Sequence, residues 1–503
     1  MAQWVSCRVG NVQFSSPFPD KIFHVASPLR KVAQNRMTIS TRPRTIGELR
    51  ESGYRLLPIK EEMRKNLIIK LRQGEDLFPG IIGYEETVIP QIENAILSGQ
   101  DIIFLGERGQ AKTRIARSLI NLLDEVVPVI AGCEINDNPF EPICKACHNK
   151  IEMQGDNVEI DWLPRDRRYG EKLATPDITI SDLVGEVDPV RVAEGRYLSD
   201  ELTIHYGLIP RTNRGIFCIN ELPDLAERIQ VGLLNIMEER DVQIRGYKIR
   251  LPLDVYVVAS ANPEDYTNRG RIITPLKDRV GSEIRTHYPR TVEHEIQIME
   301  SESNHFITDG MEIIFPQFMK EIIAEITQLA RRSNDISQRS GVSVRVSISN
   351  FENVLSSASR RALRLKERHV APRISDLPSI MASTAGKIEL DAVGDVKEDR
   401  VIQKLINAAI LSVFSEYFET REFEQLVAGF ERGLSVQVGD DMSSMEYVTQ
   451  LSKVGGLSKA IDKLKGRGSP ASIASSIEFI LEGLHLNRRL NKDQVNGKTR
   501  YRR

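Results

Sequence analysis

Residues 106–113 have the composition of a phosphate-binding loop. They follow the apolar run 102–105 and precede apolar residues at helical spacing, so we expect a strand, a loop and a helix in that order. Such a loop needs small residues that let backbone N–H groups face phosphate oxygens, a lysine for the β- and γ-phosphates and a hydroxyl for Mg²⁺. The eight candidate ATP-binding residues are Gly106, Glu107, Arg108, Gly109, Gln110, Ala111, Lys112 and Thr113. Ala111 stands where the motif has glycine, which restricts the backbone if that position requires a positive φ.

Polar residues end two further apolar runs. Asn220 and Glu221 follow the run 215–219, and Asn262 comes shortly after the run 255–259. Ligands bind at the carboxyl ends of the strands in parallel α/β sheets. There, Glu221 would polarise an attacking water, Asn220 would orient hydrated Mg²⁺, and Asn262 would contact the γ-phosphate or the water. The alternative is simple polar capping of the strand ends.

Three cysteines and a histidine lie close together in the sequence. Cys133, Cys144, Cys147 and His148 have the donor types of a tetrahedral structural zinc site. Strong zinc signatures have two close cysteine pairs and only one is present here, so free thiols in a loop remain the alternative. The Cys-x-x-Cys-His string also matches covalent haem attachment, which requires an exported protein. Because no export signal is convincing, we do not expect haem.

Composition and charge narrow the choice of partners and compartment. The 503 residues include 68 Lys and Arg against 70 Asp and Glu, a formal charge of −2, so nucleic acid and anionic membranes are not expected as partners. No run approaches the roughly 18 apolar residues that a membrane-spanning helix needs. Five cysteines suit a reducing compartment, and we expect a soluble, cytoplasmic protein. Residues 1–43 are expected to be a disordered extension or the product of a start codon placed too early, with a transit peptide as the weaker alternative.

The apolar pattern predicts an α/β core from about residue 80 to 290. Four apolar runs without polar alternation favour a parallel sheet covered on both faces: 102–105, 126–130, 216–219 and 255–259. Helical spacing predicts two short helices around Pro58, a helix over 84–97 and a hairpin over 243–251. After the core, the spacing predicts helices over 318–331, 349–367, 373–390, 401–418 and 471–486, and then a solvated basic tail from Arg488.

These ordered motifs resemble those of the AAA+ ATPases, and more narrowly the branch that holds the magnesium chelatase I-subunit and the MoxR ATPases. The resemblance covers about residues 80–390. It is carried by the loop 106–113, by 207–215 leading into Asn220-Glu221, by 233–240 and by 275–280. It implies an α/β ATPase core over 44–290 with an insertion at about 131–205, a helical lid over 291–392 and a helical C-terminal region over 393–503.

The resemblance also implies a role for each site residue by its position. Residues 106–113 correspond to Walker A, Asn220-Glu221 to Walker B and Asn262 to sensor 1, with Thr113 and, through water, Asn220 holding Mg²⁺. Arg279 corresponds to the arginine finger that reaches a neighbouring subunit's nucleotide, and Arg345 to sensor 2. Arg214 is a further candidate for a subunit boundary. Ala111 and Asn220 depart from the family pattern, which predicts slow hydrolysis.

The implied function is ATP hydrolysis in a ring, a hexamer by family resemblance, that remodels a partner. One task is metal insertion into a porphyrin beside chelatase large subunits. The other is remodelling of a protein together with a von Willebrand factor A domain protein, which would be a separate polypeptide because no Asp-x-Ser-x-Ser motif is present. Two alternatives belong to other classes: a transcription activator, whose Gly-Ala-Phe-Thr-Gly-Ala loop is missing here, and a nucleotide-dependent scaffold without turnover.

Overall fold

The computed structural model describes residues 42–188, 190, 193, 201–238, 241–243, 250–262, 271–304, 310–338, 341–390, 397–451, 456–495 and 498–503. Contacts divide the chain into two units, Met1–Pro43 and Arg44–Arg503. All the helices and strands of the described residues lie in the second unit. None of these helices combines the length and apolar character needed to cross a membrane.

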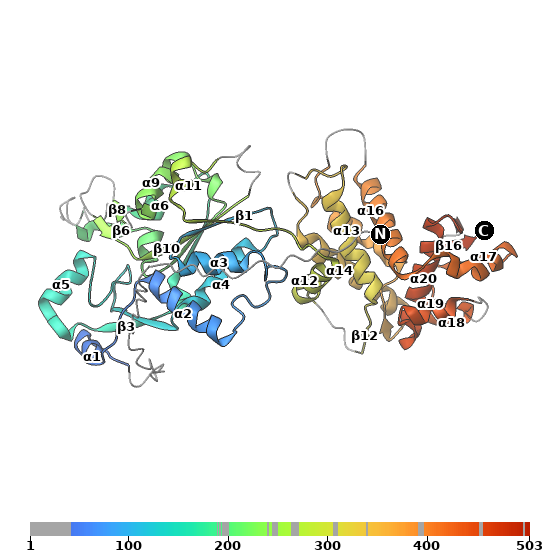
Figure 1. The fold of residues 1–503 in the computed structure, drawn as a ribbon, viewed down its shortest axis with the longest axis horizontal. Coiled ribbons are helices and arrows are strands. Elements are labelled where there is room, and N and C mark those ends of the chain that lie inside the picture. The colour runs from blue at the N-terminus through green and yellow to red at the C-terminus, as the bar shows by residue number, and fades with distance from the viewer. Residues whose placement is uncertain are drawn as a thin grey trace, which may run out of the picture. The chain divides into compact units, whose positions relative to one another are not determined.

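A five-stranded parallel sheet forms the centre of the α/β part (Figure 1). Its strands, in spatial order, are β11 (Ser282–Arg285), β1 (Ile102–Leu105), β10 (Val255–Ala261), β7 (Gly215–Asn220) and β4 (Tyr169–Leu173). Every neighbouring pair is parallel, so the carboxyl ends of β1, β10 and β7 meet at one edge. The predicted α/β fold with a parallel sheet is confirmed.

The membership of this sheet differs from the prediction. Residues 126–130 do form a strand, β2 (Val126–Ile130), but it pairs antiparallel with β3 (Ile160–Pro164) in a separate two-stranded sheet. The parallel sheet instead has β4 and β11 at its edges, with the polar sequences Tyr-Gly-Glu-Lys-Leu and Ser-Glu-Ile-Arg. An edge strand has one neighbour and buries less surface, so its side chains need not be apolar, and the apolar pattern missed both strands.

Helices cover both faces of the sheet. Alternate residues of β1 point to opposite faces, so Ile103 and Leu105 enter one core while Ile102 and Phe104 enter the other. The first core is covered by α9 (Glu227–Glu238) and α11 (Thr274–Arg279). The second is covered by α2 (Ile59–Gln73), α3 (Ile89–Leu97) and α4 (Lys112–Ser118), as Figure 1 shows.

Two local predictions in this part are confirmed. Helices α1 (Ile46–Glu51) and α2 lie on either side of Pro58. The predicted hairpin is present as the antiparallel strands β8 (Asp241–Gln243) and β9 (Arg250–Pro252), with residues 244–249 outside the described part of the chain. The predicted helix over 84–97 forms only from Ile89, as α3.

After the sheet the chain is mainly helical. The long helices are α12 (Val292–Glu302), α13 (Gln317–Arg332), α14 (Val344–Leu365), α16 (Glu398–Tyr417) and α20 (Pro470–Leu486). Shorter helices are α17 (Glu424–Glu431), α18 (Ser444–Leu451) and α19 (Leu457–Lys463). Four of the five predicted helices are therefore confirmed, although α14 begins at Val344 rather than at residue 349.

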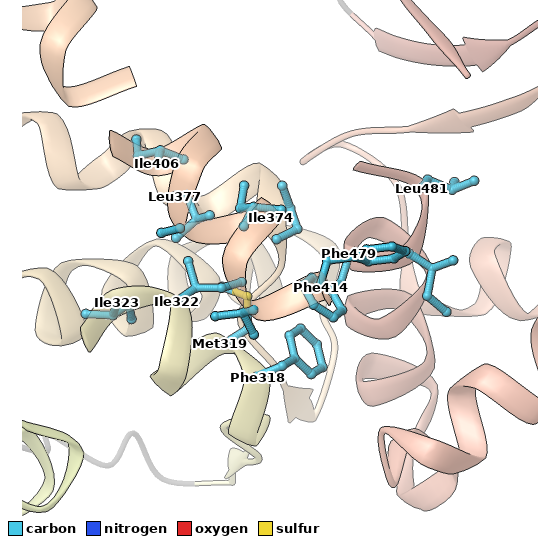
Figure 2. Close-up of a cluster of buried hydrophobic side chains, with 14 of the residues drawn as sticks. Phe318, Met319, Ile322, Ile323, Ile374, Leu377, Ile406, Phe414, Phe479 and Leu481 are labelled. Atoms are coloured by element: carbon cyan, nitrogen blue, oxygen red, sulfur yellow. The ribbon is translucent and has the colours of Figure 1, made fainter. Parts of the chain in front are cut away.

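Aromatic side chains join α13, α16 and α20 in one core (Figure 2). The rings of Phe318 and Phe479 are stacked, with centroids 4.5 Å apart and an angle of 14°. Gly483 on α20 faces Phe414 on α16, and a Cβ at this glycine would overlap the phenyl ring. The two helices therefore reach their observed separation only because residue 483 has no side chain.

Two predictions for the C-terminal part are wrong. Residues 373–390 do not form one helix but a 3-10 helix (Ile374–Ile380) and the short α15 (Met381–Thr384), because Pro378 lacks the N–H that an α-helix requires. The basic tail is not a solvated extension: β15 (Asn491–Val495) and β16 (Lys498–Arg502) form an antiparallel sheet with β14 (Val436–Val438). Alternate side chains of a strand point to opposite faces, so Tyr501 is buried while Arg502 is exposed.

Candidate nucleotide-binding site

The phosphate-loop candidate connects β1 to α4 at the carboxyl edge of the sheet. The Gly106 N–H donates to the carbonyl oxygen of Ala261, at the end of β10, over 3.1 Å. The Lys112 ammonium is buried inside the loop, where it donates to the carbonyl oxygens of Gly106 and Glu107, the latter at 2.8 Å. The expected strand, loop and helix are thus present in order, and the lysine lies where it would meet phosphate oxygens.

Ala111 has the left-handed backbone conformation that glycine favours, with φ 56° and ψ 13°, directly before α4. A side chain in this region costs roughly 1–2 kcal/mol because Cβ approaches the following carbonyl. This position therefore has the positive φ for which the phosphate-loop motif uses glycine. Alanine follows the path of the motif's glycine and adds strain to it.

The hydroxyl and the amide expected at the metal lie next to each other. Thr113 Oγ1 is 3.5 Å from Asn220 Oδ1, which also accepts a hydrogen bond from Ser260 Oγ at 3.2 Å. The Asn220 amide donates in the opposite direction, from Nδ2 to Glu171 Oε1 at 2.6 Å. Arg117 holds this carboxylate by a fork, with Nε 2.7 Å from Oε2 and Nη2 3.0 Å from Oε1.

Glu171 therefore places a carboxylate beside Asn220, the position where the Walker B motif usually has an aspartate. The neutral Asn220 turns its oxygen toward Thr113, where it would suit the oxygen coordination of a hydrated Mg²⁺, and Glu171 fixes that orientation. Sequence reasoning missed Glu171 because it lies within the polar edge strand β4. Its position follows from strand pairing alone, because the register of β4 on β7 places Glu171 opposite Cys218.

The candidate base and the candidate sensor lie at neighbouring strand ends. Glu221 directly follows β7 and has a left-handed backbone, with φ 55° and ψ 48°, and its N–H donates to Ser260 Oγ at 3.3 Å. Asn262 follows β10 and is buried. Because β7 and β10 are parallel neighbours, these side chains come from the same edge as the phosphate loop. A non-glycine residue in this conformation is strained, and such residues concentrate at functional sites.

Buried polar residues outside the motif support the back of the loop. Gln110 Oε1 accepts a hydrogen bond from Thr286 Oγ1 at 2.7 Å, and the Tyr84 hydroxyl lies 3.0 Å from the Gln110 carbonyl oxygen and 2.7 Å from that of His287. Burial raises the pKa of Tyr84 to about 12, so its hydroxyl remains a donor at neutral pH. A cavity of about 430 Å³ adjoins this side of the loop. It is lined by Leu105, Gly106, Glu107, Gln110, Lys277, Glu283, Arg285 and Thr286.

The segment before α14 lies against the same loop. A Cβ at Gly109, whose φ is 77°, would overlap the Ser343 side chain, and a Cβ at Gly341 would overlap the Glu107 carboxylate. Arg345 lies in the first turn of α14, two residues after Ser343, and is exposed. Arg345 is therefore close in sequence to a segment that touches the phosphate loop. Its role as sensor 2 stays a prediction.

The other two arginines differ in their surroundings. Arg279 is half-buried at the end of α11, where its Nη1 donates to the Pro275 carbonyl oxygen at 3.0 Å. Arg214 is buried, donates to the Pro128 carbonyl oxygen at 2.6 Å, and has its pKa lowered to about 10, mainly by desolvation. The interior position of Arg214 gives no support to a subunit-boundary role, whereas the finger role of Arg279 stays a prediction.

The three cysteines of the insertion do come together. Cys133, Cys144 and Cys147 form a cluster whose fourth candidate ligand is Asp137, with all donor atoms within 4.8 Å of one another. His148 is exposed and is not part of this cluster, so the predicted fourth ligand is wrong. It follows Cys147 directly on α5 (Lys145–Gln154), where consecutive side chains point in different directions.

Comparisons with known proteins find one matching domain family and several similar magnesium-chelatase subunits. The model of the sigma-54 interaction domain matches residues 194–280. Magnesium-chelatase subunit ChlI of Chlorella vulgaris is 26% identical over 246 residues, which cover 46% of this chain and 64% of that protein. The chloroplastic ChlI of Oryza sativa subsp. indica is 28% identical over 235 residues, covering 44% and 52%. The chain thus spans between half and two thirds of the length of these relatives.

Among solved structures, a model of the complex between magnesium chelatase subunits BchI and BchD covers 65% of this chain and 98% of its own, at 19% identity and a TM-score of 0.34. The candidate ATP-site residues of this chain lie at the carboxyl edge of its parallel sheet, and the segments matched by the ChlI proteins cover less than half of its length. The chain is therefore related, at low identity, to the ChlI subunits of magnesium chelatase and through them to the AAA+ ATPases.

Proposed function

We propose that this chain binds ATP with Mg²⁺, hydrolyses it slowly, and uses the cycle to remodel a partner. The observation that carries the proposal is the position of five polar residues at one edge of the sheet. They are Lys112, Thr113, Asn220, Glu221 and Asn262.

Each of these groups suits one part of phosphoryl transfer. The loop N–H groups and the Lys112 ammonium would hold the β- and γ-phosphates, while Thr113 and Asn220 would hold Mg²⁺ and its water. Glu221 would orient a water for attack on the γ-phosphorus and accept its proton. The bond from that phosphorus to the β–γ bridging oxygen then breaks, and ADP and inorganic phosphate leave.

Two features support a low rate. Ala111 strains the loop that must adapt to the phosphates. Asn220 brings no charge of its own to the metal, so the nearest carboxylate beside it is that of Glu171, held by Arg117. Neutral oxygen ligands bind Mg²⁺ less strongly than carboxylates do. We therefore expect a low affinity for Mg²⁺, so that turnover reaches its maximum only at high Mg²⁺ concentration.

Phosphate release by the purified chain tests the proposal. Lys112→Ala and Glu221→Gln should each lower turnover about 100-fold or more, because one removes a phosphate contact and the other the group that accepts the proton. Lys150→Ala is the matched control, since its ammonium donates to the Ala131 carbonyl oxygen in the insertion. Unchanged turnover in both site variants would refute the ATPase site. Nucleotide binding without turnover in the wild type would favour the scaffold alternative.

We further propose that the active form is a ring, with Arg279 acting on the nucleotide of a neighbouring subunit. Arg279 is half-buried at the end of α11, where its Nη1 donates to the Pro275 carbonyl oxygen at 3.0 Å, and α11 packs against α9. Sedimentation with and without ATP tests ring formation. Mixing Arg279→Ala subunits with Lys112→Ala subunits tests the role in trans, because mixed rings should recover turnover that neither pure variant has.

The partner is proposed from the relatives. The ChlI proteins are named as magnesium-chelatase subunits, and BchI is described in a complex with BchD. We therefore propose a chelatase-type partner, either chelatase large subunits with metal insertion into a porphyrin, or a separate von Willebrand factor A domain protein. Stimulation of turnover by one of these purified partners, and not by the other, would decide between the two tasks.

A further inference from the structure

The cysteine cluster of the insertion lies in the segment between β2 and β3, outside the nucleotide site. Cys133 follows β2, Asp137 lies in the loop, Cys144 is the N-cap residue of α5, and Cys147 lies in the first turn of that helix. Asp137, Cys144 and Cys147 are each at most 3% exposed. Three sulfurs and one carboxylate thus gather in a closed, buried place rather than on an open loop.

Backbone donors point at the ligand atoms of this cluster. The Asp137 N–H lies 3.4 Å from Cys133 Sγ, and the Cys147 N–H lies 3.4 Å from Cys144 Sγ. The N–H groups of Ile143 and Cys144 donate to Asp137 Oδ2 at 3.2 and 3.0 Å. Such donors stabilise thiolates and carboxylates, so the peptide dipoles offset part of the negative charge that a buried metal site gathers.

One polar atom in the cluster has no hydrogen-bond partner in the structure. Asp137 is fully buried, its Oδ2 accepts two backbone N–H groups, and its Oδ1 accepts none. A buried carboxylate oxygen without a partner is costly. Because the three sulfurs lie within 4.8 Å of this carboxylate, a cation bound among them would satisfy the remaining oxygen.

We propose that Cys133, Asp137, Cys144 and Cys147 bind one structural Zn²⁺. Thiolates select soft or borderline metals and disfavour Mg²⁺ and Ca²⁺. A tetrahedral ion with Zn–S bonds of about 2.3 Å places its sulfurs roughly 3.8 Å apart, which matches a cluster no wider than 4.8 Å. An iron–sulfur cluster gives its separate irons separate cysteines and so needs ligands that are spread more widely. Four protein ligands leave no open position, which is the arrangement of a structural rather than a catalytic zinc.

The bound ion would fix the insertion to the base of the sheet. Asn136 Nδ2 donates to the Arg211 carbonyl oxygen at 2.8 Å, and Asn213 Nδ2 donates to the Ile135 carbonyl oxygen at 3.1 Å. Both contacts come from the loop that Cys133 and Asp137 bracket. They reach the segment that enters β7 at its amino end, opposite the edge that holds the nucleotide motifs.

Elemental analysis of the full chain, purified without added metal, tests the proposal. We expect about one zinc per chain, and a loss of zinc in Cys144→Ser and Cys147→Ser. Cys7→Ser, outside the described residues, and His148→Ala should both keep it. Asp137→Cys should keep zinc as well, while Asp137→Ala should weaken zinc binding because it removes one of the four ligands. The pair separates a variant that merely fails to fold from one that has lost a ligand.

Two further measurements make the test independent of ATPase activity. Co²⁺ substituted for Zn²⁺ should give the intense visible absorption of tetrahedral thiolate coordination, and a stronger sulfur-to-metal band in Asp137→Cys. Removal of zinc by a chelator should speed hydrogen exchange in residues 131–150 and leave ATP binding unchanged. Less than a tenth of a zinc per chain with no Co²⁺ spectrum, bound iron with its own visible spectrum, or a Cys144–Cys147 disulfide in freshly purified protein would each overturn the proposal.

Discussion

Asn220→Asp, which restores the usual acidic residue of the Walker B motif, is expected to destabilise this protein when no metal is bound. In the wild type, Asn220 Nδ2 donates to Glu171 Oε1 at 2.6 Å. Aspartate cannot donate this hydrogen bond, and its carboxylate would face that of Glu171 at the same short distance. The sequence motif alone would suggest the opposite outcome, a repaired site.

The magnitude follows from the lost bond and from the new repulsion. A hydrogen bond to a charged acceptor contributes about 1.5–3 kcal/mol. Two like charges about 4 Å apart repel by about 4 kcal/mol at an effective dielectric constant of 20. The Glu171 side chain is 21% exposed and is bound by Arg117, so solvent and the guanidinium screen much of the repulsion. We expect a net loss of about 2–4 kcal/mol in the free energy of unfolding.

Urea unfolding in EDTA measures this loss in a double-mutant cycle. Asn220→Asp should unfold at lower urea than the wild type, and Glu171→Gln should lose part of the same interaction. The double variant should recover most of the stability, because the new glutamine amide can donate to the new carboxylate. Mg²⁺ with a non-hydrolysable ATP analogue should stabilise Asn220→Asp more than the wild type, since a metal would separate the two carboxylates.

Two results would refute the expected repulsion: an Asn220→Asp variant as stable as the wild type in EDTA, or a failure of Glu171→Gln to rescue that variant. Either result would mean that the amide and the carboxylate do not interact as the structure places them. Equal stabilisation of both proteins by Mg²⁺ would show that the second carboxylate does not reach the metal.

Ala111→Gly should leave the free energy of unfolding within about 1 kcal/mol of the wild type, because the relief of left-handed strain is offset by a more flexible unfolded chain. Ala111→Val should clearly destabilise the protein. Calorimetry that ranks the stabilities of the two variants in the opposite order would contradict this expectation. Gly483→Ala should lower the free energy of unfolding by about 1–3 kcal/mol, because the added Cβ overpacks the contact with Phe414. Gly429→Ala is the control, since this helical glycine has room for a Cβ and its substitution should leave the stability unchanged. Equal urea midpoints for the two variants would argue against the close helix contact. Arg331→Met should lower the free energy of unfolding by about 3–5 kcal/mol, because it leaves the fully buried Glu295 without its forked ion pair. Adding Glu295→Gln should restore part of that stability. If the losses of the two single variants simply add in the double variant, the two residues are not coupled.

Local sequence was enough to predict the parts of the site that lie on single segments. The phosphate loop needs one strand, eight residues and one helix, all contiguous, so its residues and order follow from residues 102–123. Asn220 and Asn262 were placed correctly at strand ends because β7 and β10 are continuous apolar runs. Parallel pairing then brings those ends to one edge, whatever the lengths of the connections between them.

Residues that enter the site from edge strands and loops could not be predicted in this way. Glu171 reaches Asn220 through the register of β4 on β7, and nothing in the sequence Tyr-Gly-Glu-Lys-Leu marks it as a strand. Asp137 joins the cysteines because the loop after β2 folds back on itself, with the Asp137 carbonyl accepting from the Ile130 N–H at 3.2 Å. His148 has a suitable ligand type and follows Cys147 directly in the sequence, but it is exposed on α5.

The contacts around Arg331 give a physical route from the phosphate loop to the helices after the sheet. Its guanidinium binds Glu295 on α12 at 2.7 and 3.1 Å, and its Nε donates to the Val342 carbonyl oxygen at 2.9 Å. It also lies 4.3 Å from the ring centre of Tyr288, whose hydroxyl donates to the Arg108 carbonyl oxygen at 2.9 Å. The loop is therefore linked to this arginine through Tyr288, and again through the close approach of Gly109 to the residue after Val342. The forked ion pair fixes the Arg331 guanidinium between α12 and the segment before α14, so the same side chain contacts both of these elements and the tyrosine that binds the loop.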